Sequence, residues 1–335
     1  MKNKTLRNML IPGCVAIFAV FVPGLLISLN VIDAYTAQII TLGGINAIMA
    51  ISVNVVCGIT GQLSLGQAGF MAIGSYVTII LTQTLGFPMP ASIIIAMLVT
   101  MIFGILIGFP TLKLQGDYLA IVTLGFGEII RVILVNLKSI TGGANGLRFT
   151  TILAARADYA YLLIIGMLVV VIILLQNFLR STYGRAILAV REDEIAANSN
   201  GVDVFKYKMI GFAIASAIAG FGGALYAPFI GFVKPDLASF NRSIDYLIFV
   251  VLGGMGSITG SVIAAFVLTY LQEFLRFLQD FRLLIYPLIL IFVMLFRPQG
   301  LLGMKEVSFV KLWDKFCNFI KKKSKNKMKH KKKRD

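Results

Sequence analysis

Long apolar segments separated by short polar ones run through almost the whole chain. They cover 10–29, 36–57, 66–84, 90–112, 118–137, 159–179, 209–230, 244–252, 261–278 and 284–296. A helix needs roughly 20 apolar residues to cross the hydrocarbon core of a membrane, and most of these segments have that length. The nine-residue piece at 244–252 can cross only if flanking residues extend it. The pattern predicts an all-α, polytopic membrane protein of about 8–10 transmembrane helices with broken or re-entrant segments.

The longest polar interruption is 180–208, which carries five basic and four acidic side chains and therefore must lie outside the lipid. Within it, Ile187, Val190 and Ile195 recur near helical spacing and no proline interrupts them. This spacing predicts one short amphipathic helix over 184–197. Such a helix either inserts its small apolar face into a groove of a partner protein or only connects two spans.

Composition excludes a soluble domain, since 58% of the 335 residues are hydrophobic and 14% are charged. The apolar runs are also too long for the strands of an outer-membrane barrel. The net charge of +16 is concentrated in 305–335, where thirteen Lys or Arg face three acids. We therefore expect a membrane domain over 1–303 and a basic tail over 304–335 that contacts anionic membrane lipid, and we expect no nucleic-acid partner.

Charge bias sets the expected orientation of the helices. Lys2, Lys4 and Arg7 place the N-terminus in the cytoplasm, because loops rich in Lys and Arg stay on that side. Six crossings then return the chain to the cytoplasm at 180–208, and four more bring the C-terminus to the same side. The loop at 141–147 is accordingly expected on the outer side.

Two glycine-rich breaks, at 58–70 and 253–260, occupy similar places in the two halves of the chain. Paired breaks of this kind line a permeation site in many transporters, although small residues also allow simple close packing of helices. The amide and hydroxyl groups beside the first break need partners, which makes its residues candidates for the translocation path. These candidates are Gln62, Ser64, Gln67 and Gly69.

Two further groups could line the path. Glu128 and Arg131 stand three residues apart in the apolar segment 118–137, and an ion pair that stabilises the fold is a better interpretation than a substrate contact. Glu128 is counted as the only acid deep in a span. The sequence TGGANGL at 141–147 is typical of a tight turn, and the alternative is a gate or receptor contact. The candidates there are Thr141, Gly142, Gly143, Asn145 and Gly146.

The sequence lacks recognisable catalytic machinery. It contains neither a phosphate-binding glycine loop that ends in Lys-Ser/Thr nor an HExxH pattern, and its single histidine, His330, lies in the tail. Cys14, Cys57 and Cys317 are scattered and predict neither a disulfide nor a metal site. We expect no catalytic residue, no metal and no cofactor in this chain, so that any energy from ATP must come from a partner.

Six stretches, taken together and in order, resemble the LivM-type permease subunits of branched-chain amino acid ABC importers. They are GQLSLGQAGFMAIGSY (61–76), LQGDYLAIVTLGFGEIIR (114–131), TGGANGL (141–147), GRAILAVREDEIAANSNGV (184–202), VLGGMGSITG (251–260) and FRPQGL (296–301). The resemblance covers about 40–303 and leaves out the lysine-rich tail.

The resemblance implies an ABC importer permease fold in a bacterial plasma (inner) membrane. It also implies a second permease of the LivH type, two ATPases of the LivG and LivF types that bind ATP and Mg, and an extracytoplasmic amino-acid-binding protein. The implied substrates are leucine, isoleucine and valine, and the alternatives are urea or another small amide or acid, a secondary transporter, or a membrane scaffold. The stretch 184–202 becomes the coupling segment that docks on an ATPase. Its expected coupling residues are Gly184, Arg185, Arg191, Glu192, Asp193, Glu194, Ile195, Ala196, Ala197 and Gly201.

Overall fold

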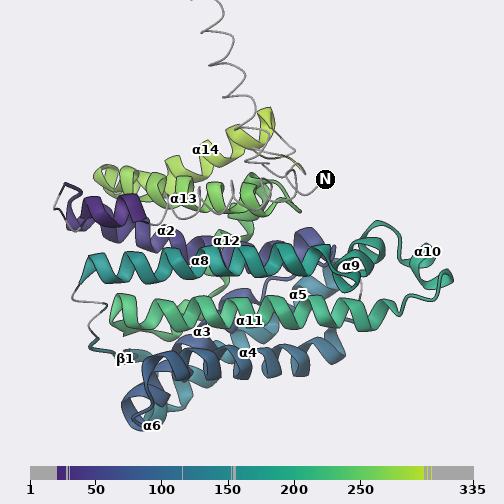
Figure 1. The fold of residues 1–335 in the computed structure, drawn as a ribbon, viewed down its shortest axis with the longest axis horizontal. Coiled ribbons are helices and arrows are strands. Elements are labelled where there is room, and N and C mark those ends of the chain that lie inside the picture. The colour runs from purple at the N-terminus through teal and green to yellow at the C-terminus, as the bar shows by residue number, and fades with distance from the viewer. Residues whose placement is uncertain are drawn as a thin grey trace, which may run out of the picture.

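A bundle of long α-helices forms the body of the molecule, and these helices run side by side along its long axis (Figure 1). The computed structural model describes residues 21–27, 29, 31–114, 116–151, 153, 156–297, 300 and 303. The main elements are α2 (Ala34–Val53), which continues as the π-helix η1 (Asn54–Ile59), α3 (Gln67–Ile79), which continues as η2 (Ile80–Thr84), α4 (Met89–Thr111), α5 (Asp117–Asn136), α8 (Ala157–Arg180), α11 (Val204–Ile230), α12 (Phe240–Gly253), α13 (Ile258–Phe274) and α14 (Arg282–Phe296).

Short elements gather at the two ends of the bundle. They are α6 (Lys138–Thr141), η3 (Gly143–Asn145), β1 (Leu147–Arg148), α9 (Thr182–Glu192), α10 (Glu194–Ser199), β2 (Phe232–Val233), η4 (Pro235–Ala238) and η5 (Leu275–Phe281). The strands β1 and β2 pair antiparallel, with Leu147 opposite Val233. In Figure 1, α9 and α10 lie at the right-hand end, whereas α6 and β1 lie at the left-hand end. The polar connections therefore lie at the ends of the bundle, as a membrane domain requires.

Six helices in the described part of the chain are long and apolar enough to cross a membrane. They are Ala34–Ile59, Met89–Thr111, Asp117–Asn136, Ala157–Arg180, Val204–Ile230 and Ile258–Gln279. The prediction of an all-α, multi-pass membrane protein is confirmed. Residues flanking 244–252 lengthen that piece to the 14 residues of α12, which is not among these six candidates, so its crossing stays a prediction. The exact number of crossings stays a prediction, because most of the expected span 10–29, like the tail at 304–335, lies outside the described residues.

Small residues let the central helices approach closely. A Cβ added to Gly74 of α3 would collide with the carbonyl oxygen of Gly220 on α11, and one added to Gly223 would collide with the carbonyl oxygen of Met71. Lipid chains are as apolar as leucine, so contact between backbones and buried hydrogen bonds must supply much of the attraction between helices in a membrane. These glycines consequently hold α3 and α11 together at the centre of the bundle.

Candidate coupling segment and helix breaks

The coupling segment starts at a tight turn between α8 and α9. The Ser181 hydroxyl caps α9 by accepting a hydrogen bond from the backbone N–H of Gly184, at 3.3 Å. Gly184 lies so close to Leu179 that a Cβ would collide with the backbone of α8. The α9 helix then buries Ile187 and Val190 against the bundle, which fixes its orientation.

The single helix predicted over 184–197 is wrong, because the structure divides it at Asp193. This residue is extended, with φ −158° and ψ 110°, and its carboxylate accepts hydrogen bonds from the N–H groups of Ile195 and Ala196, both at 2.9 Å. An aspartate offers the backbone a partner other than the next helical carbonyl and so favours a new N-terminus over a continuous helix. The result is two short helices, α9 and α10, joined at a corner.

The apolar surface of α10 differs from the one expected. Ile195 is 81% exposed, which is unusual for an isoleucine, and Ala196 is exposed beside it. Ala197 is only 6% exposed and packs inward, so it cannot provide the open apolar contact that the sequence predicted. The exposed apolar feature of this helix is therefore Ile195 and its neighbour.

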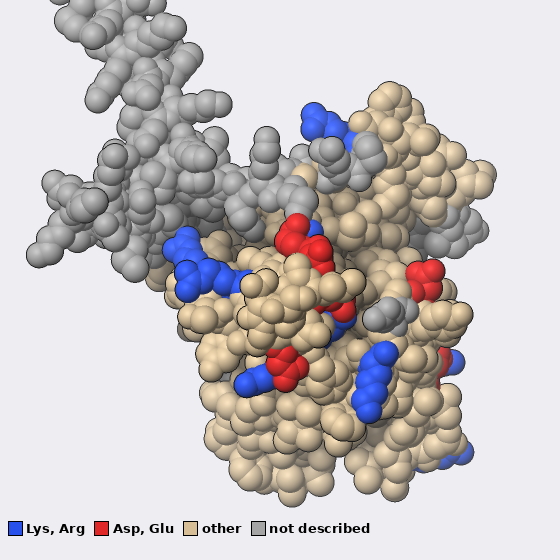
Figure 2. Space-filling view, turned by 90° about the vertical axis from the view of Figure 1, so that its right-hand side faces the viewer, with Lys and Arg blue, Asp and Glu red and all other residues tan. Residues whose placement is uncertain are grey.

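An ion pair anchors α10 to the bundle. Glu194 lies 2.5 Å from the ammonium of Lys208, a side chain of α11 that is itself largely buried. Gly201 then takes a left-handed conformation, φ +79°, where the chain turns into α11. Viewed from this end in Figure 2, acidic side chains lie near the middle of the face with basic side chains around them. Arg185, Glu192 and Asp193 are exposed, whereas Arg191 is half-buried.

Both predicted helix breaks are present, and the fold brings them into contact. The first separates η1 from α3 between Ile59 and Gln67, and the second separates α12 from α13 between Gly253 and Ile258. The backbone N–H of Gly256 donates a hydrogen bond to the Asn54 side-chain carbonyl at 2.8 Å. This hydrogen bond joins the second break to η1, the π-helix that leads into the first break. The correspondence between the two halves that the sequence suggested stays a prediction.

Polar side chains at the first break are buried with part of their hydrogen-bonding capacity unused. Gln62, Ser64 and Gln67 are at most 4% exposed. Within the described residues, Nδ2 of Asn54, Nε2 of Gln62 and Gln67, and Oγ of Ser64 have no hydrogen-bond partner. Buried polar atoms almost always bind something, so water or a polar solute fits this place. The path role of these residues stays a prediction.

The first break is held against α5. The N–H of Leu65 donates to the Thr123 hydroxyl at 3.1 Å, and a Cβ added to Gly69 would lie 3.1 Å from Cα of Gly127. Gly69 is therefore a residue of close helix packing, and its lack of a side chain is what lets α5 approach the break.

Glu128, which follows Gly127 in α5, forms the predicted ion pair with Arg131. Their side chains meet at 2.7 Å and are 34% and 37% exposed. Glu128 also accepts a hydrogen bond from the N–H of Phe240 at 3.2 Å, and Arg131 lies 3.8 Å from Asp236. The pair thus ties α5 to η4 and to the start of α12.

The 141–147 loop lies at the opposite end from the coupling segment and is built as a turn (Figure 1). The buried Thr141 hydroxyl donates to the carbonyl of Leu137 at 2.8 Å, and the N–H of Gly143 donates back to it at 3.2 Å. The glycines take left-handed conformations that other residues rarely adopt. These glycines are Gly142, Gly143 and Gly146, and Asn145 between them is exposed. A gating or receptor role for this loop stays a prediction.

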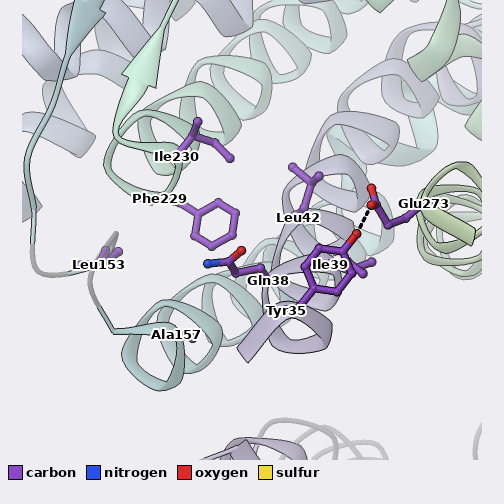
Figure 3. Close-up of a pocket in the computed structure, with 9 residues that line it drawn as sticks. All are labelled: Tyr35, Gln38, Ile39, Leu42, Leu153, Ala157, Phe229, Ile230 and Glu273. Carbon is purple, nitrogen blue, oxygen red and sulfur yellow. Dashed lines mark hydrogen bonds between the residues drawn. The ribbon is translucent and has the colours of Figure 1, made fainter. Parts of the chain in front are cut away.

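Two acids in apolar helices were overlooked in the sequence analysis. The statement that Glu128 is the only acid deep in a span was therefore wrong. Asp245 lies in α12 and Glu273 in α13. Figure 3 shows Glu273 beside Tyr35, whose hydroxyl donates to it, at a cavity of about 260 Å³ between α2, α8, α11 and α13. Arg276 also lies 2.9 Å from Glu273. The signal was available, since both acids stand inside segments that the sequence analysis had marked as apolar.

Comparison with known proteins decides the family. The family model for the permease component of branched-chain amino acid transport systems matches residues 35–296, which is most of the chain. The chain belongs to this family. It contains both helix breaks, α5 and the coupling segment, so every candidate element of the site falls within the matched permease region.

Curated relatives agree with this membership. The permease protein LivM of the Escherichia coli K12 high-affinity branched-chain amino acid transport system is 38% identical over 80% of this chain and 70% of its own length. The probable branched-chain amino acid transport permease protein LivM of Methanocaldococcus jannaschii is 25% identical over 64% of this chain and 69% of its own length. LivH of the same Escherichia coli system is 26% identical over 81% of this chain and 95% of its own length. A search of solved structures found no match. Because its family and its curated relatives are described as transport permease components, this permease is a membrane transport subunit and not an enzyme.

Proposed function

We propose that this permease is one of two membrane subunits of an ATP-driven importer that carries leucine, isoleucine and valine into a bacterial cell through the inner membrane. The observation that carries the proposal is the family match over 35–296. The names of its Escherichia coli relatives assign LivM and LivH to one transport system, and this chain is similar to both. A LivH-type partner of similar fold therefore completes the membrane channel.

The remaining partners follow from what the chain lacks and what it exposes. Its sequence has no nucleotide-binding motif, so the proposal assigns ATP and Mg to two ATPase subunits of the LivG and LivF types. The exposed Ile195, which follows three consecutive acids, supports docking of α10 in a groove of one ATPase. An extracytoplasmic amino-acid-binding protein delivers the substrate at the end that carries the 141–147 loop, and both chain termini lie in the cytoplasm.

The structure supports a mechanical route from the ATPases to the solute path. The α10 helix is anchored to α11 by the Glu194–Lys208 pair, and α9 packs by Ile187 beside the first break. Movement of the coupling segment would be transmitted to α11 and to the break, where Gln62 and Gln67 have unused donors. Opening the contact between the breaks would expose those donors to a passing amino acid, whose carboxylate can accept their hydrogen bonds.

Uptake into proteoliposomes tests the proposal. The complete complex, with its binding protein and internal ATP, should accumulate radiolabelled leucine, and complexes without ATP should not. Unlabelled isoleucine or valine in hundredfold excess should abolish the signal, whereas urea and lysine should leave it intact. Inhibition by urea but not by isoleucine or valine would assign urea or another small amide as the substrate. Accumulation without ATP would favour a secondary transporter.

A further inference from the structure

The α9 helix ends beside both helix breaks, and Arg191 in its last turn contacts each of them. A Cβ added to Gly61 in the first break would lie 3.2 Å from Cγ of Arg191. A Cβ added to Gly256 in the second break would lie 2.9 Å from Nη1 of the same side chain. The aliphatic stem of Arg191 therefore passes Gly61 and its guanidinium reaches Gly256.

The backbone at both contacts is specific to glycine. Gly61 has φ +72° and Gly256 has φ +90°, so a side chain at either position would strain the backbone as well as displace Arg191. Gly256 is also joined to Asn54 of η1 by the 2.8 Å hydrogen bond between the breaks. One arginine, two glycines and one asparagine thus form a continuous contact from the coupling segment to both broken helix pairs.

Arg191 differs from the other charged residues of α9 in where it lies. Arg185 and Glu192 are exposed to solvent, while Arg191 is half-buried against the breaks. The remaining inward contacts of α9 are apolar ones, through Ile187 and Val190, and such contacts are not directional. Arg191 instead packs its stem at Gly61 and its guanidinium at Gly256, so a single side chain of α9 lies against both breaks.

We propose that Arg191 is a positioning residue that joins the coupling segment to both helix breaks, so that movement of α9 changes the two breaks together. The inference rests on the proposed function, because it assumes that an ATPase moves α9. Arg191 transmits movement of α9 to the breaks within the membrane subunit, whereas α10 docks on the ATPase.

Transport measurements on the assembled complex test this assignment. In Arg191→Gln, ATPase co-purification and the rate of ATP hydrolysis should stay within about twofold of the unsubstituted complex. The amount of leucine taken up per ATP hydrolysed should fall at least tenfold. Arg180→Gln, at an exposed arginine that ends α8 and lies outside the expected coupling residues, is the matched control and should keep normal coupling. Arg191→Lys keeps the stem and the charge and should recover more than half of the lost uptake. Unchanged uptake per ATP in Arg191→Gln, or loss of the ATPases from it, would overturn the inference.

Cys57 offers a readout that does not depend on uptake. It lies half-buried in η1, next to the first break, with its Sγ 4.0 Å from the Ser64 carbonyl. With Cys14 and Cys317 replaced by serine, a small thiol reagent should modify Cys57 at rates that differ at least threefold between nucleotide-free and vanadate-trapped complexes. Arg191→Gln should remove this difference, and the control Arg180→Gln should retain it.

The two measurements separate the inference from the function on which it rests. A reference complex without ATP-driven leucine uptake would show that the proposed function fails. A reference complex that transports normally, combined with an Arg191→Gln complex whose Cys57 still responds to nucleotide, would show that only the role of Arg191 is wrong.

Discussion

Two ion pairs in this bundle lie where one element meets the next. Lys208 of α11 is largely buried and is neutralised by Glu194 of α10, and Glu128 meets Arg131 beside the start of α12. A charge left alone at such a position would lose its hydration without a compensating partner. The ion pairs therefore stabilise contacts between elements whether or not they also touch a solute.

The Glu128–Arg131 pair provides a stability test at the residue scale. Glu128→Gln should lower the stability of the detergent-solubilised permease by about 0.5–1 kcal/mol, since Arg131 keeps only its longer contact with Asp236 and the Phe240 N–H loses its charged acceptor. The double change Glu128→Gln with Arg131→Met should cost less, because no charge is left behind. Thermal unfolding of both variants measures the difference. If both unfold normally and leucine uptake is lost, the pair acts in transport and our structural interpretation is wrong.

The sequence predicted some of these residues well and others poorly. The spacing of Glu128 and Arg131 was enough to predict their pairing, because i and i+3 residues are neighbours on any helix. The inward packing of Ala197 was not predictable, since its surroundings come from the way α10 folds back toward α11. The contact of Arg191 with Gly61 and Gly256 was likewise hidden, because it joins three segments that are distant along the chain.

Helix contacts in the centre depend on residues that are small rather than apolar. Gly74 and Gly223 bring α3 and α11 to backbone contact, whereas Gly166 of α8 has nothing within 4 Å of an added Cβ. Both kinds of glycine look alike in the sequence, where each stands in an apolar helix. Only the packing of the bundle tells them apart.

Paired glycine substitutions test this difference at the scale of an element. Gly74→Ala should destabilise the permease by about 1–3 kcal/mol, because the added methyl group collides with the carbonyl of Gly220 and forces the helices apart. Gly166→Ala should be neutral or slightly stabilising, since alanine is the better helix former. Fluorescence-detected size-exclusion chromatography after heating compares them directly. Equal melting temperatures would contradict the packing described for α3 and α11.

The hydrophobic pattern also located most of the elements, and its main failure was at polar corners. Apolar runs marked every long helix, because lipid requires a continuous apolar span. The division of the coupling segment at Asp193 was missed, since the local choice between a helix interior and a helix cap depends on backbone angles. The glycine-rich breaks were located correctly, but their contact through Asn54 and Gly256 is tertiary.

At the scale of the whole molecule, the polar ends of the bundle should face opposite sides of the membrane. Ser199 in α10 and Ala144 in η3 are both exposed. The helix α10 and the helix α6, which η3 directly follows, lie at opposite ends of Figure 1. A cysteine at Ser199 should react with an impermeant reagent only from the cytoplasmic side, and one at Ala144 only from outside, because charge bias orients the spans. Labelling of both positions from the same side would contradict the topology and remove the 141–147 loop as a receptor-facing element.

The most direct test of the whole account joins docking to transport in one measurement. Ile195→Glu places a charge on the exposed apolar residue of α10. Ile140→Glu makes the same change at an exposed isoleucine of α6, a helix that lies at the other end in Figure 1. At matched permease levels, Ile195→Glu should reduce ATPase co-purification and ATP-driven leucine uptake together by at least tenfold, because a charge is costly in an apolar interface. Ile140→Glu should retain the full ATPase complement. Full uptake with a full ATPase complement in Ile195→Glu would contradict the account, because the coupling segment would then be only a connector.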